Sequence, residues 1–479
     1  MSSKGWNLKH SYAELPEIFY RNQRPAEAVA SQMAVFNRGL AQTLGLDANN
    51  LQNAPEIFTG TVLPPGAKPI SQAYAGYQFG HFAMLGDGRA VLLGEQITPD
   101  GSRFDIQLKG SGTTPYSRGG DGLAALSPML REYIISEAMF FLGIPTTRSL
   151  AVALTGKNVM RDKVSKSAVL TRVASSHIRV GTFDYIFAFG TKEDLQTLAD
   201  YCVWRHFPWI ENQEGENKYI LLFREIARLQ ASLIAKWQMV GFIHGVMNTD
   251  NMAISGETID YGPCAFMDTY KPDTVFSSID TSGRYSYKNQ PIAGAWNLTR
   301  LAQALLPLIH EDEDKAAALA QGEIANYWER YDENWLFGMR AKLGIISEEA
   351  EDADLIGELL DLMETHKLDY TNTFHSLSYQ KDSPFFEIPE CISWHEKWQA
   401  KLGRQQKGAN YAMELMKKHN PAVIPRNYRV EEALLAAEHA DLSVMHNLLE
   451  VLSTPYNESE VYSLPPKPSL RRYRTFCGT

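Results

Sequence analysis

The spacing of apolar and polar residues predicts a β-rich first part of the chain. Between about residues 69 and 110, short β-prone runs are separated by glycine. Val91–Ile97 is predicted to form a strand, and after a Thr-Pro-Asp-Gly-Ser turn Phe104–Lys109 alternates apolar and polar residues, as a half-buried strand does. Two further strands are predicted at Arg148–Leu154 and Ala168–Val173.

Helical patterns dominate beyond about residue 190. The helices predicted there are Lys192–Arg205, Tyr219–Met239, Leu298–Ile309, Lys315–Arg340, Asp352–Thr365 and Val430–Leu452. Two helices are predicted earlier, at Ala26–Leu44 and at Met129–Leu142, the second after a Ser-Pro pair that suits a helix start. The pattern therefore predicts an α+β protein with its strands in the first half.

Composition and charge narrow the classes of protein to consider. Of the 479 residues, 44% are hydrophobic and 21% charged, as in ordinary globular proteins. The net charge of -10 argues against general nucleic-acid binding. No apolar run is long enough to cross a bilayer, and the first residues lack the apolar stretch of a secretory signal. We therefore expect a cytoplasmic protein with no nucleic-acid or membrane partner.

The segment from His244 to Asn251 contains several candidate catalytic and metal-binding residues close together in the sequence. It reads His-Gly-Val-Met-Asn-Thr-Asp-Asn, and Asp-Tyr-Gly follows at Asp260, so that a loop–hairpin–loop is predicted. Carboxylate and carboxamide oxygens are ligands that Mg²⁺ accepts while it stays bound to phosphates. Asn251 and Asp260 are therefore candidate metal ligands, and Asp250 is a candidate proton acceptor. The alternative is an Asx-rich turn that only closes a hairpin.

One position in this segment differs from ordinary kinases. A His-Gly turn, an Asp-Asn pair and Asp-x-Gly are typical of a kinase catalytic loop and its metal-binding aspartate. A phosphotransferase carries its catalytic aspartate directly after His-Gly, where this chain has Val246. The nearest acid is displaced to Asp250, so that the pattern indicates kinase-like chemistry with an altered base.

A glycine-rich segment precedes the predicted strands. Gly76–Gly80 and the run Gly86-Asp-Gly88-Arg89 lie between β-prone stretches. Glycine lets backbone amides approach phosphates closely, and Arg89 is a candidate partner for an oxygen of a triphosphate. A glycine-rich hairpin without any ligand is the alternative.

A lysine and a glutamate follow in the order that kinase-like folds use. Lys109 ends a predicted strand, and Glu132 lies in the next predicted helix. In such folds a strand lysine holds nucleotide phosphates, and a helical glutamate keeps it charged and in place. Glu137 lies in the same helix, and spacing alone does not separate the two glutamates.

Arginines and glycines that ordinary kinases lack complete the candidate chemistry. Asp121 and Gly122 end a glycine-containing run before the predicted helix, and Arg172 and Arg179 follow the later strands. Guanidinium groups present paired donors that suit phosphate oxygens. Surface salt bridges are the alternative for both arginines.

These features together predict a bilobal protein-kinase-like fold. The β-rich N-terminal lobe, with an N-terminal extension, is assigned to residues 1–185. The larger helical lobe, with the catalytic loop, the metal site and the C-terminal tail, is assigned to residues 186–479.

The chain resembles the selenoprotein O family, called YdiU-type in bacteria, over nearly its whole length. Besides the His-Gly-Val-Met-Asn-Thr-Asp-Asn-Met and Asp-Tyr-Gly-Pro motifs, the resemblance rests on Gly143–Arg148, Gly283–Pro291, Asp369–Phe374 and Pro425–Tyr428. It implies an atypical kinase-like fold that binds ATP in an inverted pose. It further implies Mg²⁺-dependent transfer of AMP to Ser, Thr or Tyr hydroxyls of proteins, with release of pyrophosphate. Mn²⁺ and UTP are alternatives to Mg²⁺ and ATP.

The resemblance also implies roles for individual residues. Asp250 would accept the proton, Glu132 would orient Lys109, and Asn251 with Asp260 would hold the metal. Nucleotide contacts are implied for Gly86, Gly88, Arg89, Lys109, Asp121, Gly122, Arg172, Arg179 and Asp260.

The chain departs from the family pattern at two places. Leu123 stands where family members usually have arginine, and Cys477 is the counterpart of a selenocysteine found near the end of some members. Among the four cysteines, a regulatory disulfide between Cys264 and Cys477 is a further hypothesis. Two alternative functions stay open: a γ-phosphoryl-transferring kinase, and a non-catalytic, redox-responsive nucleotide-binding scaffold.

Overall fold

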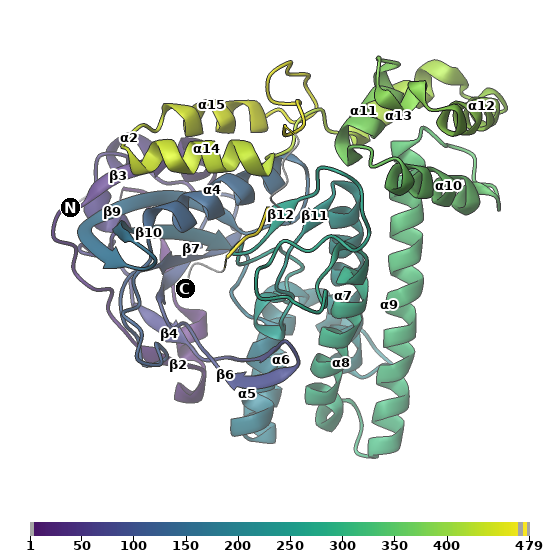
Figure 1. Cartoon of the computed structure of the whole chain (residues 1–479). Helices are drawn as coiled ribbons and strands as arrows, with labels where there is room; N and C mark the ends of the chain where they lie inside the picture. Colours follow the sequence, from purple (N-terminus) through teal and green to yellow (C-terminus); the bar gives the residue numbers. More distant parts are fainter. Residues whose placement is uncertain (1–3, 468–472, 477–479) are drawn as a thin grey trace.

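The structure, a computed structural model, describes residues 4–467 and 473–476. Its strands are β1 (Leu8–Lys9), β2 (Tyr20–Asn22), β3 (Gln32–Phe36), β4 (Ile70–Gln72), β5 (Ala75–Gln78), β6 (His81–Met84), β7 (Ala90–Ile97), β8 (Arg103–Lys109), β9 (Arg148–Met160), β10 (Val164–Ala174), β11 (Phe242–Ile243) and β12 (Ala265–Phe266). The main sheet is antiparallel in the order β2-β4-β7-β8-β10-β9-β3, with β1 added to β7. The presence of both helices and strands, with the strands in an antiparallel sheet, confirms the α+β prediction (Figure 1).

Helices follow and surround the sheet. They are α1 (Arg38–Thr43), α2 (Ala48–Leu51), α3 (Pro55–Phe58), α4 (Leu126–Phe141), α5 (Val180–Phe189), α6 (Lys192–His206), α7 (Lys218–Met239), α8 (Gln290–Ile309), α9 (Glu313–Lys342), α10 (Asp352–Thr365), α11 (Tyr370–Tyr379), α12 (Pro389–Gly403), α13 (Gly408–His419), α14 (Asn427–Glu438) and α15 (Ser443–Leu452). No helix of the described residues is long and apolar enough to cross a membrane.

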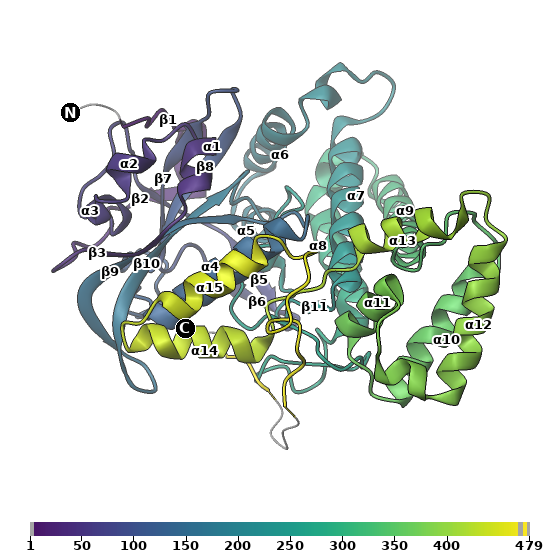
Figure 2. The same cartoon turned by 90° about the horizontal axis from the view of Figure 1, so that it is seen from above.

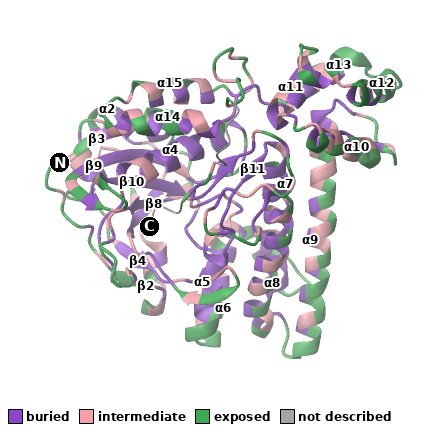
Figure 3. Ribbon diagram, in the orientation of Figure 1, coloured by how far each residue is buried: buried purple, intermediate pink, exposed green. Residues whose placement is uncertain are grey.

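Both faces of the main sheet are covered. On one face, side chains of α1–α3 pack with Leu93, Ile106, Leu108 and Leu150 in a compact core. On the other, α4 belongs to the largest core of the molecule, which continues into α5, α7 and α8. Figures 1 and 2 show α14 and α15 lying on α4, and Figure 3 shows how completely the central strands are buried. Helices α10–α13 form a further core with the end of α9.

Two predicted helices are wrong in extent. Within Ala26–Leu44, residues 32–36 form strand β3, because they pair with β9 at the edge of the main sheet, and helix starts only at α1. Val430–Leu452 is interrupted between α14 and α15, where Ala440 has a left-handed φ of +65°. In the first case, pairing with the sheet outweighed the local preference for helix. In the second case, the break between the two helices is too short to disturb the periodic spacing of apolar residues.

The other predicted elements are confirmed within a few residues at most ends. The predicted helix at Leu298–Ile309 begins earlier, at Gln290, and helices α2, α3, α5, α11, α12 and α13 were not predicted. β11 and β12 pair antiparallel and flank the segment around Asp250, which itself is mostly loop. The predicted division at residue 185 falls inside α5, and the two-lobe organisation stays a prediction.

Candidate functional site

Alternation along β8 places the polar side chains of the site. Asp105, Gln107 and Lys109 occupy every second position, and Ile106 and Leu108 lie between them. Successive side chains of a strand point to opposite faces of the sheet. The two apolar residues pack in the core with α1–α3, which leaves the polar three on the α4 side.

Three cations converge on Asp260. Lys109 Nζ and Arg172 Nη1 donate to Asp260 Oδ1, at 2.6 and 2.7 Å, and Arg179 Nη1 donates to Oδ2 at 2.8 Å. Arg172 lies opposite Gln107 in the β8–β10 pair and donates to its side-chain oxygen at 2.6 Å. Arg179 directly precedes α5. Asp260 itself has a left-handed φ of +64°, which aspartate tolerates better than most residues.

Helix α4 supplies the glutamate of this group. Glu132 lies 2.6 Å from Lys109 Nζ and 3.3 Å from Arg172 Nη1. Glu137, on the same helix, instead binds Arg148 through both carboxylate oxygens, at 2.7 and 2.6 Å. The pairing that the spacing left open is therefore with Glu132. The Asp260 cluster consists of Lys109, Glu132, Arg172, Arg179 and Asp260.

The Asp260 cluster carries a surplus of positive charge. Burial alone would raise the pKa of Asp260, but the charges of Arg172, Lys109 and Arg179 hold it well below its usual range. Within the ion pairs of the cluster, three cations share two carboxylates, an excess of one positive charge that the carboxyl groups of Asp87 and Asp250, which also act on Arg179, partly offset when ionised. Such an excess at a protein site favours an anionic ligand such as a phosphate.

Asp250 lies next to the Asp260 cluster, in the 3-10 turn Thr249–Asn251. Arg179 joins the two, because its Nη1 also donates to the Asp250 carbonyl oxygen at 2.7 Å. Asp250 Oδ1 is buried and has no hydrogen-bond partner within the described part of the chain. Burial, opposed by the charge of Arg179, raises the pKa of Asp250 to about 7. A carboxylate of this kind is suited to accept a proton near neutral pH.

The β5–β6 hairpin closes over Asp250. The Tyr77 N–H donates to Thr249 Oγ1 at 2.9 Å. A Cβ at Gly76 would lie 2.1 Å from Asp250 Oδ1, so that any side chain at this position would collide with the carboxylate. The glycine is therefore needed for the hairpin to approach the turn that holds Asp250.

The second predicted metal ligand fits a hard cation. The Asn251 side-chain nitrogen donates to the Val246 carbonyl at 2.9 Å, which leaves the carboxamide oxygen as the ligand atom. Residues 4–467 and 473–476 contain no group of three or more His, Cys, Asp or Glu that could hold a metal. One carboxylate and one carboxamide suit Mg²⁺, which keeps several waters and takes phosphate oxygens as further ligands. Asn251 and Asp260 are thus compatible with Mg²⁺ delivered together with a nucleotide.

The second glycine segment has a packing role that the sequence did not reveal. A Cβ at Gly86 would lie 2.5 Å from the ring of Tyr116, and one at Gly88 would lie 2.8 Å from the Tyr116 carbonyl oxygen. Arg89 follows as a partly exposed residue whose charge helps to lower the pKa of Asp121. The nucleotide contacts expected for these residues stay predictions.

Asp121 does not belong to the ion pairs of the Asp260 cluster. It is exposed and binds Arg161 with both oxygens, at 2.8 and 3.0 Å. Gly122, by contrast, is buried against the Gly112 carbonyl. The structure therefore puts Asp121 near Arg89 at the surface and leaves Arg172 and Arg179 with Asp260.

Two groups beside the Asp260 cluster were not singled out from the sequence. Asp87 accepts from the Gln72 N–H at 3.0 Å and from Gln107 Nε2 at 3.1 Å. Burial raises its pKa to about 6, although Arg179 acts in the opposite direction. Asp87 stands between the two glycines of the predicted phosphate segment, which is the signal that could have pointed to it.

His177 and Asp105 form a chain of hydrogen bonds that holds the Arg172 side chain in place. Arg172 Nε donates to His177 Nε2 at 3.2 Å, and His177 Nδ1 lies 3.1 Å from Asp105. Burial lowers the pKa of His177 to about 4, so the ring is neutral and its Nδ1 carries the proton. The alternation of Asp105 with Lys109 on one strand face was the available signal for this layer.

Comparison with known proteins assigns the chain to a family. A family model described as "Protein adenylyltransferase SelO" matches residues 5–453. The chain belongs to this family.

Bacterial SelO-family relatives match from end to end. The chain is 59% identical to "Protein nucleotidyltransferase YdiU" of Geobacillus kaustophilus (strain HTA426), over 99% of both chains. It is 58% identical to the protein of the same name from Halalkalibacterium halodurans, over 99% of this chain and 98% of that one. These relatives support the assignment of this chain as a nucleotidyltransferase.

Two cysteines concern the predicted regulatory disulfide near the C-terminus. Cys264 is buried, its Sγ lies 3.4 Å from the Tyr261 carbonyl, and burial raises the pKa of its thiol to about 12. Cys477 lies outside the described residues. Thr475, two positions earlier, donates to the Pro263 carbonyl at 2.5 Å, so the chain passes beside the neighbour of Cys264. The disulfide itself stays a prediction.

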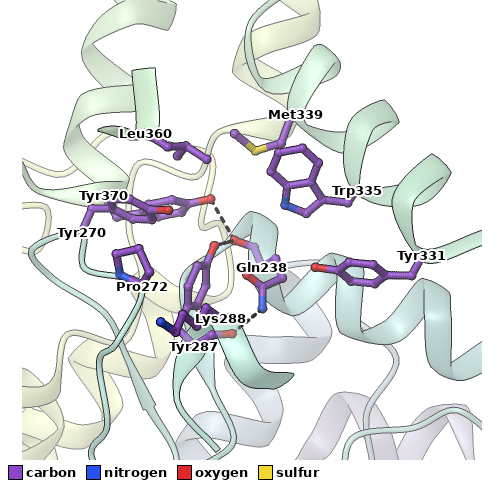
Figure 4. A pocket seen from close by; sticks show the side chains of 10 residues that line it. All are labelled: Gln238, Tyr270, Pro272, Tyr287, Lys288, Tyr331, Trp335, Met339, Leu360 and Tyr370. Atoms are coloured by element: carbon purple, nitrogen blue, oxygen red, sulfur yellow. Dashed lines mark hydrogen bonds between the residues drawn. The ribbon is translucent and has the colours of Figure 1, made fainter. Parts of the chain in front are cut away.

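A cavity of about 210 Å³ lies elsewhere, between α7, α9, α10 and α11. Figure 4 shows its aromatic walls, in which the hydroxyls of Tyr287 and Tyr370 both donate to the Gln238 carbonyl, at 2.7 and 2.8 Å. None of the predicted site residues lines this cavity. It is therefore separate from the Asp260 cluster.

Proposed function

We propose that this chain transfers AMP from ATP to the hydroxyl of Ser, Thr or Tyr residues in proteins and releases pyrophosphate. The observation that carries the proposal is the convergence of Lys109, Arg172 and Arg179 on Asp260, next to the unpartnered carboxylate oxygen of Asp250. An excess of cations beside a potential base is what nucleotidyl transfer requires. The family to which the chain belongs supports the reaction class.

Each group of the site has a role in the proposed transfer of AMP. The acceptor oxygen attacks the α-phosphorus, and its proton passes to the Asp250 carboxylate. The bond from the α-phosphorus to the bridging oxygen of the β-phosphate breaks, and that oxygen leaves with pyrophosphate. Lys109, Arg172 and Arg179 hold the triphosphate and stabilise the charge that develops on the leaving group. Glu132 keeps Lys109 charged and oriented.

A divalent cation completes the proposed site. Asn251 and Asp260 would hold Mg²⁺, or Mn²⁺ in its place. When bound, the cation would neutralise phosphate charge and orient the phosphate oxygens. Lys109, Arg172 and Arg179, which contact the Asp260 carboxylate, would be available to the phosphates when this carboxylate holds the metal.

The inverted pose of ATP and a kinase-like arrangement of two lobes, 1–185 and 186–479, are part of the proposal. Arg172 and Arg179 support the inverted pose, because they place guanidinium groups beyond the lysine on which kinases rely. Further contacts with the nucleotide are proposed for Gly86, Gly88, Arg89, Asp121 and Gly122.

Two labelled forms of ATP test the reaction. The protein and a cell extract are incubated with Mg²⁺ and ATP labelled at either the α- or the γ-phosphate, and bound label and intact masses are measured. We expect label from the α-position and a mass increase of one AMP. Label from the γ-position alone would identify a kinase and overturn the proposal. With Asp250→Asn, transfer should be lost while ATP binding is kept.

A further inference from the structure

A row of aromatic side chains lies along the β5–β6 hairpin, which packs against the turn that holds Asp250. Trp296 of α8, Tyr77 of β5, Phe82 of β6 and Phe189 of α5 follow one another with ring centroids 5.7, 5.4 and 6.1 Å apart. Figure 1 shows the β6 strand beside α5. The row thus joins three segments that are far apart in the sequence.

The outer end of this row is exposed. Phe82 has 41% and Phe189 has 52% of its surface open to solvent. The β6 strand is mostly exposed as well (Figure 3). Single exposed apolar residues are ordinary, but touching ones mark a surface that binds a partner.

The middle of the row is held against the turn that carries the proposed base. The Tyr77 N–H donates to Thr249 Oγ1 at 2.9 Å, and the Phe79 N–H donates to Asn248 Oδ1 at 3.1 Å. The neighbour of Thr249 is Asp250. The hairpin that carries Tyr77 and Phe82 is therefore anchored to the turn that holds the proposed base, so that the aromatic row adjoins this turn.

Two arginines give this surface a charge. The Arg284 guanidinium lies 4.7 Å from the Trp296 ring, and that of Arg300 lies 4.0 Å from the Tyr77 ring. Neither forms an ion pair with a carboxylate in residues 4–467 or 473–476. Arg300 also donates to the Tyr77 hydroxyl, and its charge acts on the buried carboxyl group of Asp184. Arg284 is therefore the guanidinium that favours an acidic partner, in a chain of net charge -10.

The backbone of β6 favours an extended partner. β5 and β6 form a two-stranded sheet, and β5 uses its outer side to bind the turn beside Asp250. β6 is therefore an edge strand, to which an extended segment can add with backbone hydrogen bonds.

We propose that this surface binds the acceptor protein as an extended segment in which acidic and aromatic or large apolar residues flank the modified hydroxyl. The acceptor face consists of Tyr77, Phe82, Phe189, Arg284, Trp296 and Arg300. This inference rests on the proposed adenylyl transfer and gives that reaction a substrate class.

Synthetic peptides test the acceptor face. Each peptide carries one Tyr, and the set places Glu, Lys, Phe or Ser at each flanking position in turn. The full-length protein and its variants receive ATP labelled at the α-phosphate, and ATP binding is measured separately. We expect Glu to be preferred over Lys by about fivefold, the size of one favourable exposed ion pair, and Phe to be preferred over Ser.

Two variants and two controls locate the preference. Arg284→Glu should abolish or reverse the preference for Glu, and Phe82→Ser combined with Phe189→Ser should remove the preference for Phe, both with unchanged ATP binding. Arg404→Glu and Phe337→Ser change exposed residues of the helical region and should leave both preferences intact.

The outcomes separate the two proposals. Equal labelling of all peptides, or an Arg284→Glu protein that still prefers Glu, overturns the acceptor face and leaves adenylyl transfer standing. If neither the peptides nor the proteins of a cell extract take up α-label, the proposed function is overturned, and the acceptor face with it.

Discussion

Two largely buried clusters of this molecule use the same side-chain types with opposite balance of charge. In the Asp260 cluster, three cations meet two carboxylates. In the second cluster, Arg426 alone binds Asp268 at 2.7 Å and Asp369 at 2.6 Å. We call Arg426, Asp268 and Asp369 the Arg426 cluster.

The difference separates a binding site from a structural joint. Arg426 connects the segment after β12 to the start of α11, and its two Nη groups donate to side chains of the protein, including Asn372 at 3.0 Å, while its Nε has no partner among the described residues. The Asp260 cluster keeps a positive charge beside the unpartnered oxygen of Asp250. Buried ion pairs alone thus do not indicate function, whereas an excess of one sign beside a reactive group does.

The largest expected effect is on activity. Asp260→Asn removes the carboxylate that gathers the cations and is proposed to hold the metal, so AMP transfer should fall by about 10³-fold. The matched variant Asp268→Asn lies in the Arg426 cluster and should keep its rate within a few-fold. Rates of α-label incorporation measure both, and similar losses in the two variants would contradict the distinction between the clusters.

The reverse experiment concerns stability. Arg426→Met leaves two carboxylates without their cation, which should lower the free energy of unfolding by about 3–5 kcal/mol. Denaturant unfolding measures this loss, and Arg404→Met at an exposed position is the control. Activity per folded molecule should be kept. An inactive but stable Arg426→Met protein would place this cluster in the site.

The two glutamates of α4 give a finer comparison. Glu132→Gln weakens the hold on Lys109, so AMP transfer should fall about 10- to 100-fold, with a raised KM for ATP. Glu137→Gln affects the ion pair with Arg148 and should change stability more than rate. Steady-state kinetics with varied ATP distinguish the two, and equal kinetic losses would argue against the assignment of Glu132.

The smallest expected effect is a pH dependence of stability. Among the described residues, Glu257 pairs with no cation and accepts hydrogen bonds from Ser175 and Ser255 alone, and burial raises its pKa to about 7. The folded protein keeps this proton while the unfolded chain loses it near pH 4.5, so stability falls as pH rises from about 4.5 to 7. Glu257→Gln should remove a slope on the order of 1 kcal/mol per pH unit in this window. Unfolding at several pH values measures it, and an unchanged slope would show that Glu257 does not titrate there.

Much of the fold could be predicted because its signals are local. The alternation in Phe104–Lys109 and the apolar period of Tyr219–Met239 each reflect which side of an element is buried. The strand β3 could not be predicted in this way, because its pairing with β9 joins segments more than a hundred positions apart. The break at Ala440 is local but too short for a periodic pattern to reveal.

The candidate site likewise contains residues that local sequence signals identify and residues that only the fold brings together. Asp250, Asn251 and Asp260 were identified from one short segment, since their chemistry and spacing are contained in it. The association of Arg172 and Arg179 with Asp260 depends on residues 88 and 81 positions away. The alternative that they are surface salt bridges was removed only by their burial in one cluster.

The sequence by itself determined the types of reactive group, their order along the chain and the face of β8 on which Lys109 lies. Only the tertiary structure decided that Glu132 and not Glu137 meets this lysine, and that Asp121 stays with Arg161 at the surface. The physical reason is that side-chain types and periods are properties of neighbouring residues. Partners are chosen by the register of the sheet and by the packing of α4 upon it, to which the whole chain contributes.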